Sequence, residues 1–212
     1  DGIKNQHSTN ELINVDLEMY NFIKSEKKKN VFNIIYCPTY RPENNSLHWI
    51  KKIDFDFIDK FCLDYNINFF INFHQSDWDF AHIFFKNKKY KKIYMFKKFM
   101  DVYPNLYFSS MLITDYSSIY VDYLVLKNPI LFFRPDKKLF EEKIGLYKKN
   151  IHDVGIEIQN KEDLKEKIIN IISLKKNSDN TYDDKIKHST NFFQVSNEKD
   201  NCEEIYSYLK SN

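Results

Sequence analysis

The sequence predicts an α/β fold, a Rossmann-like parallel sheet with helices on both faces. The first observation behind this prediction is a series of short, almost continuously apolar runs of strand length. Strands with one solvent-facing side would instead alternate apolar and polar residues. The second observation is that segments with helical spacing of apolar residues separate several of these runs, as in parallel sheets. The chain of 212 residues is long enough to bury such a core.

Each expected strand is an apolar, β-rich run that ends at proline, glycine or polar residues. The expected strands are Phe32–Cys37, Asn68–Phe73, Ile93–Phe96, Met111–Thr114, Pro129–Phe133 and Gly155–Ile158. The expected helices are Glu18–Lys24, a helix capped by Ser46 that continues to Asp64, Ile119–Leu126, Lys161–Leu174 and Glu198–Leu209. We expect residues 1–30 to be a polar N-terminal segment and residues 31–212 to form one domain.

The composition restricts the class of protein. Hydrophobic residues make up 42% of the chain, as in globular proteins. The net charge is only +2, which argues against a nucleic-acid partner, because such proteins normally carry a clear basic excess. No apolar run approaches the ~20 residues of a transmembrane helix, and no signal peptide is visible, so we expect a cytoplasmic protein.

Cysteine spacing and glycine content exclude several common sites. Cys37, Cys62 and Cys202 lack the spacing of zinc ligands and are expected to be buried thiols in a reducing compartment. No cluster of carboxylates indicates a required Mg²⁺, and we expect neither a metal nor a cofactor. The chain has only three glycines, which excludes a P-loop and a GxGxxG fingerprint. Any phosphate must therefore be held by hydroxyls, cationic side chains and helix N-termini.

Such an anion site is predicted where the strand Met111–Thr114 leads through Asp115 and Tyr116 into Ser117 and Ser118. The first backbone N–H groups of a helix lack partners within the helix, and the helix dipole favours negative charge there. Ser117 is equally consistent with a simple helix N-cap. The two interpretations are compatible, because a capping serine already lies beside any anion that the helix end attracts.

Polar side chains that follow the strands support this location. Ligands of parallel α/β sheets bind outside the carboxyl ends of the strands. Arg41, His74, Asp115 and Arg134 each follow an expected strand and should gather at that edge. Arg41 and Arg134 are the only arginines in the chain, and the planar guanidinium suits phosphate recognition.

These residues lie in motifs that resemble a known family. The segment LITDYSSIYVDYLVLKNPILFFRPD, the later GLY at Gly145–Tyr147, and YCPTYR at Tyr36–Arg41 resemble the CDP-glycerol glycerophosphotransferases of teichoic-acid and capsule synthesis. The resemblance covers about Phe32 to Leu174. It implies the C-terminal, donor-binding half of a two-domain GT-B glycosyltransferase architecture.

The resemblance also implies roles for individual residues. Ser117, Ser118 and Asp122 match the family residues at the donor pyrophosphate. Arg41 matches the arginine of the upstream signature, and His74 takes the position of a catalytic or phosphate-binding histidine. The neighbouring Thr39, Thr114, Asp115 and Arg134 complete the expected donor site.

The implied reaction is attack of an acceptor hydroxyl on the β-phosphorus of CDP-glycerol or a related CDP-alditol, with CMP leaving. Arg41 would offset developing charge, and His74 would donate a hydrogen bond or a proton. The acceptor would be a growing teichoic-acid or capsule polymer on a lipid carrier. The lysine-rich segment Lys86–Lys98 is either a solvated face or a contact with an anionic membrane, which would make the protein peripheral on the inner face of the cell membrane.

The sequence departs from the family pattern at two points. His74 is followed by Gln75 where the family has proline, and the WHGTP-like motif of the family's N-terminal domain does not occur. We therefore expect a fragment of a longer enzyme. Two other functions stay open: a GT-B enzyme that transfers a glycosyl group from a nucleotide sugar, and a non-catalytic nucleotide-binding module.

Overall fold

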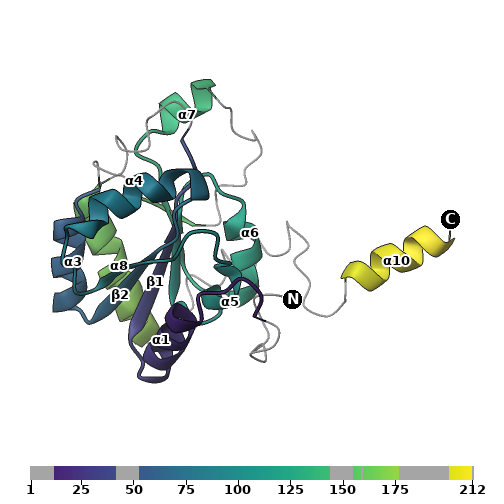
Figure 1. Ribbon diagram of the computed structural model, residues 1–212, viewed down its shortest axis with the longest axis horizontal. Coiled ribbons are helices and arrows are strands. Elements are labelled where there is room, and N and C mark those ends of the chain that lie inside the picture. The colour runs from purple at the N-terminus through teal and green to yellow at the C-terminus, as the bar shows by residue number, and fades with distance from the viewer. Residues whose placement is uncertain (1–11, 42–52, 144–154, 159, 177–200, 212) are drawn as a thin grey trace.

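The computed structural model describes residues 12–41, 53–143, 155–158, 160–176 and 201–211. Its centre is a six-stranded, entirely parallel sheet with the strand order β3-β2-β1-β4-β5-β6 (Figure 1). The strands are β1 (Phe32–Cys37), β2 (Ile67–Ile71), β3 (Ile93–Met95), β4 (Met111–Thr114), β5 (Ile130–Phe133) and β6 (Ile156–Ile158). The predicted parallel sheet is confirmed; β1 and β4 have the predicted bounds, and the ends of the other strands differ from the predicted ones by at most two residues.

The order in which successive strands join the sheet reverses between β1 and β4. From β1 the chain moves outward through β2 to β3, then returns to the other side of β1 and continues through β4 and β5 to β6. Ile34 of β1 lies opposite Phe69 of β2 on one side and Met111 of β4 on the other. The carboxyl ends of β1 and β4 therefore flank the topological switch point, where open α/β sheets bind their ligands.

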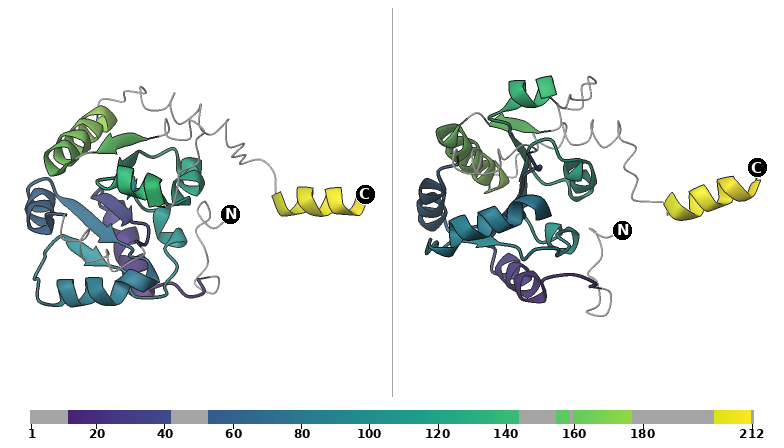
Figure 2. Two further views of the ribbon diagram at one scale, coloured as in Figure 1. Left: turned by 90° about the horizontal axis from the view of Figure 1, so that it is seen from above. Right: turned by 45° about the horizontal axis from the view of Figure 1, so that its top comes forward.

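Helices cover both faces, as predicted. The described helices are α1 (Leu17–Lys28), α3 (Phe55–Asp64), α4 (Gln75–Lys86), α5 (Tyr103–Leu106), α6 (Ile119–Tyr123), α7 (Lys137–Lys143), α8 (Lys161–Lys176) and α10 (Asn201–Ser211). Apolar side chains of α3 and α8, which lie beside each other in Figures 1 and 2, form the core on one face. Side chains of α1, α5 and α6 form the core on the other.

Successive residues of a strand enter alternate cores. Ile34 belongs to the core under α3 and α8, whereas its neighbour Ile35 belongs to the core under α1 and α6. Because side chains alternate across a strand, a strand with both faces covered must be apolar at successive positions. This explains why the strands are visible in the sequence as continuous apolar runs.

Two helix predictions need correction. The helix expected from Ser46 to Asp64 begins at Phe55, where the Asp54 carboxylate accepts the backbone N–H of Phe57 at 3.0 Å; Ser46 itself lies outside the described residues. Helix α4 was not predicted, although it starts directly at His74. Its buried positions are Asp77 and Ala81, whereas Phe80 and Ile83 are exposed, so its buried face does not follow its large apolar residues.

The other predicted helices are present. The helix expected over 119–126 is α6 followed by the 3₁₀ turn Leu124–Leu126. The helices predicted over 161–174 and 198–209 correspond to α8 and α10. The short helices α5 and α7 were not predicted, because neither is long enough to show a helical period.

The polar segment expected over residues 1–30 is in part a component of the domain. Helix α1 is longer than the predicted Glu18–Lys24, and Tyr20 and Ile23 are buried in the core with β1. The side-chain amide of Asn33 donates to the carbonyl of Ile23 at 3.2 Å and ties α1 to that strand. Five lysines and five asparagines make this segment polar overall and hide the two core positions.

Two expectations from composition concern burial. Cys37 and Cys62 are buried free thiols, as predicted, and burial raises the pKa of Cys62 to about 12. Among the described residues, no helix is both long and apolar enough to cross a membrane.

Candidate functional site

Four of the predicted site residues lie in the loops at the carboxyl ends of β1, β4 and β5. Thr39 and Arg41 follow β1, Asp115 follows β4, and Arg134 follows β5. These three strands are neighbours in the sheet, so the loops meet at one edge, beside the switch point.

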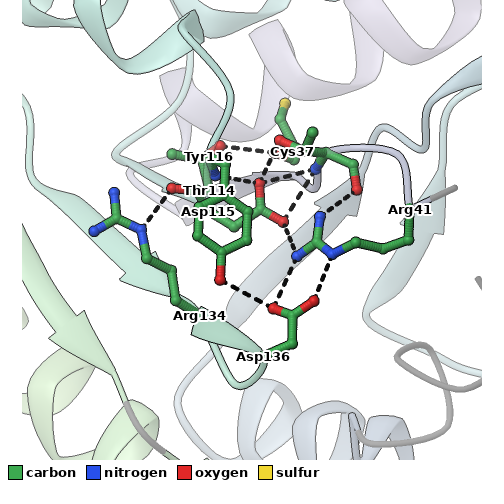
Figure 3. Close-up of polar contacts among 8 residues, drawn as sticks. Cys37, Arg41, Thr114, Asp115, Tyr116, Arg134 and Asp136 are labelled. Carbon is green, nitrogen blue, oxygen red and sulfur yellow. Dashed lines mark hydrogen bonds and ion pairs between the residues drawn. The ribbon is translucent and has the colours of Figure 1, made fainter. Parts of the chain in front are cut away.

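Asp115 joins the loop after β4 to the loop after β1 (Figure 3). Its carboxylate accepts the backbone N–H of Thr39 at 2.9 and 3.1 Å and the Thr39 hydroxyl at 2.6 Å. It also accepts the Arg41 guanidinium at 2.8 Å and the backbone N–H of Tyr116 at 2.6 Å. Asp115 is 1% exposed, and these donors occupy the acceptor positions of a carboxylate. Asp115 therefore positions the two loops and has little capacity left for a ligand.

Arg41 extends this network to the loop after β5. Its Nε donates to Asp136 Oδ2 at 2.6 Å, its Nη2 donates to Asp136 Oδ1 at 3.2 Å, and its Nη1 donates to the carbonyl of Thr39 at 2.6 Å. The paired bonds to Asp136 are the bidentate arrangement for which a guanidinium is suited. Burial alone would lower the pKa of Arg41, but the hydrogen bonds and charges of Asp136 and Asp115 raise it overall. Arg41 is a permanent cation held between two carboxylates.

Tyr116 closes the network on its outer side. Its hydroxyl donates to Asp136 Oδ1 at 3.0 Å, and its ring stacks on Phe140 with the centroids 3.7 Å apart. The Arg41 guanidinium carbon lies 4.9 Å from the centre of the Tyr116 ring. Burial, followed by the nearby Asp136 carboxylate, raises the pKa of Tyr116, so the hydroxyl keeps its proton and remains a donor.

Arg134 is also enclosed by protein groups. Its Nε donates to the backbone carbonyl of Asp115 at 2.7 Å, and its Nη1 pairs with Glu157 on β6 at 2.7 Å. The guanidinium carbon lies 4.0 Å from the centre of the Phe132 ring. Only 2% of the side chain is exposed. Arg134 therefore fixes the loop after β4 against β5 and β6.

Thr114 has a similar internal role. Its hydroxyl donates to the carbonyl of Cys37 at 2.8 Å, and the residue is fully buried. This bond joins the last residues of β1 and β4 immediately below the loops (Figure 3). Thr39, Arg41, Thr114, Asp115 and Arg134 are thus brought together in a single buried network.

His74 lies outside this network but beside it. It caps α4, where its Nδ1 accepts the backbone N–H of Ser76 at 3.2 Å. Its ring centre is 5.3 Å from that of Tyr40, which lies between Thr39 and Arg41 in the loop after β1. Because Nδ1 is an acceptor, the neutral imidazole carries its proton on Nε2. The side chain is exposed, so this proton is available to a bound ligand.

Ser117, Ser118 and Asp122 form an outer group at the start of α6. The Ser117 hydroxyl oxygen accepts the backbone N–H of Ile119 at 3.4 Å, which is a capping contact. Ser118 is exposed and its side chain makes no capping bond. Asp122 is also exposed and accepts the Tyr103 hydroxyl at 2.8 Å. Burial, followed by the Asp122 hydrogen bond and charge, raises the pKa of Tyr103 to about 12.

The structure adds partners that reasoning from the sequence did not assign. Asp136 follows β5, and no pattern in the sequence indicates that it pairs with Arg41. Glu157, Tyr103 and Tyr40 carried no signal, because each contacts a site residue that is distant in the sequence or hidden in a loop. No group of three or more His, Cys, Asp or Glu side chains in the described part of the chain is placed to hold a metal ion.

Comparison with known proteins assigns the family. A family model described as CDP-Glycerol:Poly(glycerophosphate) glycerophosphotransferase matches residues 4–210. The chain belongs to this family. This match confirms the resemblance that the TDYSS and YCPTYR motifs indicated.

Relatives in the family are polymerases of wall polymers. The teichoic acid poly(glycerol phosphate) polymerase of Bacillus subtilis (strain 168) is 32% identical over 116 residues, which are 54% of this chain and 15% of that protein. The teichoic acid ribitol-phosphate polymerase TarL of Staphylococcus aureus (strain NCTC 8325 / PS 47) is 30% identical over 105 residues, 49% of this chain and 18% of that protein. This glycerophosphotransferase-family chain thus matches only a small part of these relatives.

Solved structures show the same fold. The wall teichoic acid polymerase TagF matches with a TM-score of 0.62 and 24% identity, over 86% of this chain and 44% of that one. A histidine variant of TagF soaked with CDPG matches with a TM-score of 0.58 and 23% identity, over 84% of this chain and 42% of that one. These two TagF structures confirm the expected likeness to one half of a GT-B enzyme.

Proposed function

We propose that this chain is the donor-binding domain of a transferase that moves glycerol phosphate, or another alditol phosphate, from a CDP-activated donor to a growing cell-surface polymer. The observation that carries the proposal is the start of α6 at the switch point, where Ser118 is exposed and makes no side-chain capping bond to the helix, beside the capping Ser117. Family membership and the TagF variant soaked with CDPG support a CDP-alditol as the donor.

The site residues divide into contact and positioning roles. Ser117, Ser118 and the adjacent backbone N–H groups would contact the pyrophosphate, and the exposed Asp122 would contact the donor from the same helix. Thr39, Thr114, Asp115 and Arg134 would act indirectly, because their polar groups already bind one another.

Arg41 is assigned to charge compensation at the phosphates through its loop. Its guanidinium is paired with Asp115 and Asp136, so its cationic field is partly offset. The pairs hold the β1 loop rigidly against the β4 loop, and a rigid site aligns donor and acceptor at little entropic cost. This preorganisation is the main contribution that we assign to Arg41.

In the proposed reaction, a bond forms between an acceptor hydroxyl oxygen and the β-phosphorus of the donor. The bond from that phosphorus to the bridging oxygen breaks, CMP leaves with the bridging oxygen and its electron pair, and the proton of the acceptor hydroxyl passes to water or to the leaving CMP. His74 is placed to donate an Nε2–H hydrogen bond to a phosphate oxygen of the donor, because its Nδ1 is already the acceptor of the Ser76 N–H. Such reactions depend mainly on positioning and electrostatic stabilisation.

The acceptor polymer on a lipid carrier implies a peripheral position at the inner face of the membrane. The segment Lys86–Lys98 offers a contact. Lys88, Lys97 and Lys98 already pair with carboxylates. Exposed lysines without an ion pair among the described residues are Lys86, Lys89 and Lys91. Replacing these three by glutamine should reduce co-sedimentation with phosphatidylglycerol vesicles but leave donor binding unchanged; unchanged co-sedimentation refutes the contact.

Calorimetric titration tests the donor assignment. We expect CDP-glycerol to bind, CMP to bind more weakly, and UDP-sugars not to bind. The double variant Ser117→Ala/Ser118→Ala should have an affinity for CDP-glycerol at least tenfold lower than the wild type, because charge-assisted hydrogen bonds to phosphate are lost. Ser173→Ala, an exposed serine of α8, serves as the matched control and should bind as the wild type does.

The outcomes separate the candidate functions. Preferential binding of a UDP-sugar would support a glycosyltransferase instead. If the double variant and the control bind CDP-glycerol with equal affinity, the pyrophosphate does not bind at the start of α6.

A further inference from the structure

A second cavity lies at the opposite edge of the sheet, at the amino ends of β1, β4 and β5. Its volume is about 440 Å³, and its walls come from the last turns of α1, from Tyr107 and Phe108 before β4, and from the segment before β5. In Figure 1, α1 is at the lower end of the molecule, whereas α4 and α7 are at the upper end. The cavity is therefore separate from the candidate donor site.

Three lysines of α1 line this cavity: Lys24, Lys27 and Lys28. The described part of its lining contains no carboxylate. Glu26, the acidic residue within the same turns, is directed elsewhere: it accepts Lys29 at 2.8 Å and the side-chain amide of Asn68 at 3.2 Å. The cavity thus concentrates positive charge without an internal counter-ion.

Lys27 shows the consequence of this arrangement. The side chain is half-buried, and its ammonium donates to the Ser110 hydroxyl at 3.5 Å, a long and neutral contact. Burial lowers the pKa of Lys27. A partly desolvated ammonium without an anion is unfavourable, and a bound anion would compensate it.

Lys24 is held at the cavity by aromatic rings. Its ammonium lies 5.6 Å from the ring centre of Tyr20 and 5.8 Å from that of Phe108. Cations over ring faces are attracted by the ring quadrupole, which leaves the ammonium hydrogens available on the other side. The aromatic rings therefore orient Lys24 without neutralising its charge.

The helix dipole explains only part of this cluster. Lysines are favoured in the last turn of a helix, because they interact with its partial negative charge. The dipole does not require these lysines to face a cavity whose other walls come from Tyr107, Phe108, Leu126 and Asn128, much later in the chain. Lys29, in the same region, has the ordinary arrangement, an exposed pair with Glu26.

We propose that this lysine cavity binds a phosphate-bearing anion. Each ammonium offers three donors around a compact charge, which suits phosphate oxygens approached from several directions. The cavity volume exceeds that of a single phosphate, so a chain of phosphates or a phosphate with an attached alditol fits. The source of the phosphate is either a soluble poly(alditol phosphate) or the head group of an anionic lipid.

Site-resolved NMR of the whole chain tests the proposal independently of the donor site. Tripolyphosphate is titrated while the backbone amide signals of Lys24, Lys27, Lys28 and Tyr107 are followed. We expect saturable shifts at these residues. Lys24→Gln/Lys27→Gln/Lys28→Gln should weaken binding there at least tenfold. Lys28→Gln alone, at an exposed position, should weaken it severalfold and serves if the triple variant does not fold.

A matched control removes the same charge from other elements. Lys60→Gln/Lys138→Gln/Lys165→Gln should leave the affinity at the α1 amides within about twofold of the wild type. If the two triple variants lose the same affinity for tripolyphosphate, the effect comes from general electrostatics, and the proposed site in the cavity is refuted. An absence of saturable shifts at the α1 amides would also overturn it, whatever happens at Ser117 and Ser118.

Vesicles then identify the source of the phosphate. Phosphatidylglycerol vesicles that retain the wild type, but not the α1 triple variant, assign the cavity to a lipid head group. Tripolyphosphate binding without vesicle retention through α1 assigns it to a soluble polymer. Pure phosphatidylcholine vesicles, which carry no net charge, provide the baseline.

Discussion

Replacing Asp115 by asparagine should destabilise the protein by about 3 kcal/mol, which is at the lower end of the cost of breaking a buried ion pair by removing one partner. The Asp115 carboxylate is buried and binds Arg41 at 2.8 Å and the Thr39 hydroxyl at 2.6 Å. Asparagine keeps one acceptor oxygen for Thr39, but its amide donor would face the guanidinium donor. The cost stays at the lower end because Asp136 still neutralises Arg41.

Urea unfolding at pH 7, followed by circular dichroism, measures this change. For a domain of this size, about 3 kcal/mol corresponds to a fall in melting temperature of roughly 6–12 °C. Asp79→Asn is the matched control, because Asp79 forms an exposed ion pair with Lys98 at 2.6 Å. Exposed pairs contribute about 0–1 kcal/mol. If Asp115→Asn loses no more stability than Asp79→Asn, the network does not hold the two loops together.

Three further predictions concern the same fold. The pKa of Asp136 is lowered overall, although burial opposes its ionisation, because Arg41 stabilises the carboxylate; its contribution is therefore present above its unfolded pKa and lost as the pH falls through the folded value. Urea unfolding from pH 7 to pH 3 should show the stability gap between the wild type and Asp136→Asn shrinking, and a constant gap contradicts the assignment. Gly155→Ala should lower the free energy of unfolding by about 1–3 kcal/mol, because a Cβ there would lie 2.7 Å from the carbonyl oxygen of Ile130. An unchanged melting temperature would contradict this and show that β6 shifts freely. Tyr123→Phe should cost about 1 kcal/mol through loss of the buried 2.7 Å hydroxyl bond to Ser109, and calorimetry would contradict this if the variant were as stable as the wild type.

The strands were predictable because their signal is local. Ile34, Ile35 and Tyr36 are apolar in succession since each side of β1 is covered by a separate core. Helix α4 was not predicted, because the buried Asp77 interrupts the apolar stripe on which helix prediction depends. Helix α3 was given the wrong start, since Ser46 and Asp54 are both acceptable caps and only the fold selects Asp54.

The two arginines illustrate what the sequence left open. Their positions after β1 and β5 correctly predicted that they lie at the carboxyl edge. The sequence suggested that both face a phosphate, but the structure pairs Arg41 with Asp115 and Asp136, and Arg134 with Glu157. A sequence shows that a cation and several acids follow neighbouring strands, yet it does not show which of them meet.

The sequence by itself determined the parallel α/β fold, the family and the edge of the sheet that carries the TDYSS motif. Apolar periodicity and short motifs are properties of neighbouring residues, so they can be read without coordinates. Only the tertiary structure separated the buried network around Asp115 from the exposed hydroxyl of Ser118. The ion pairs of Arg41 in that network join residues 74 and 95 positions apart, and they depend on strand register and side-chain direction, which no local pattern encodes.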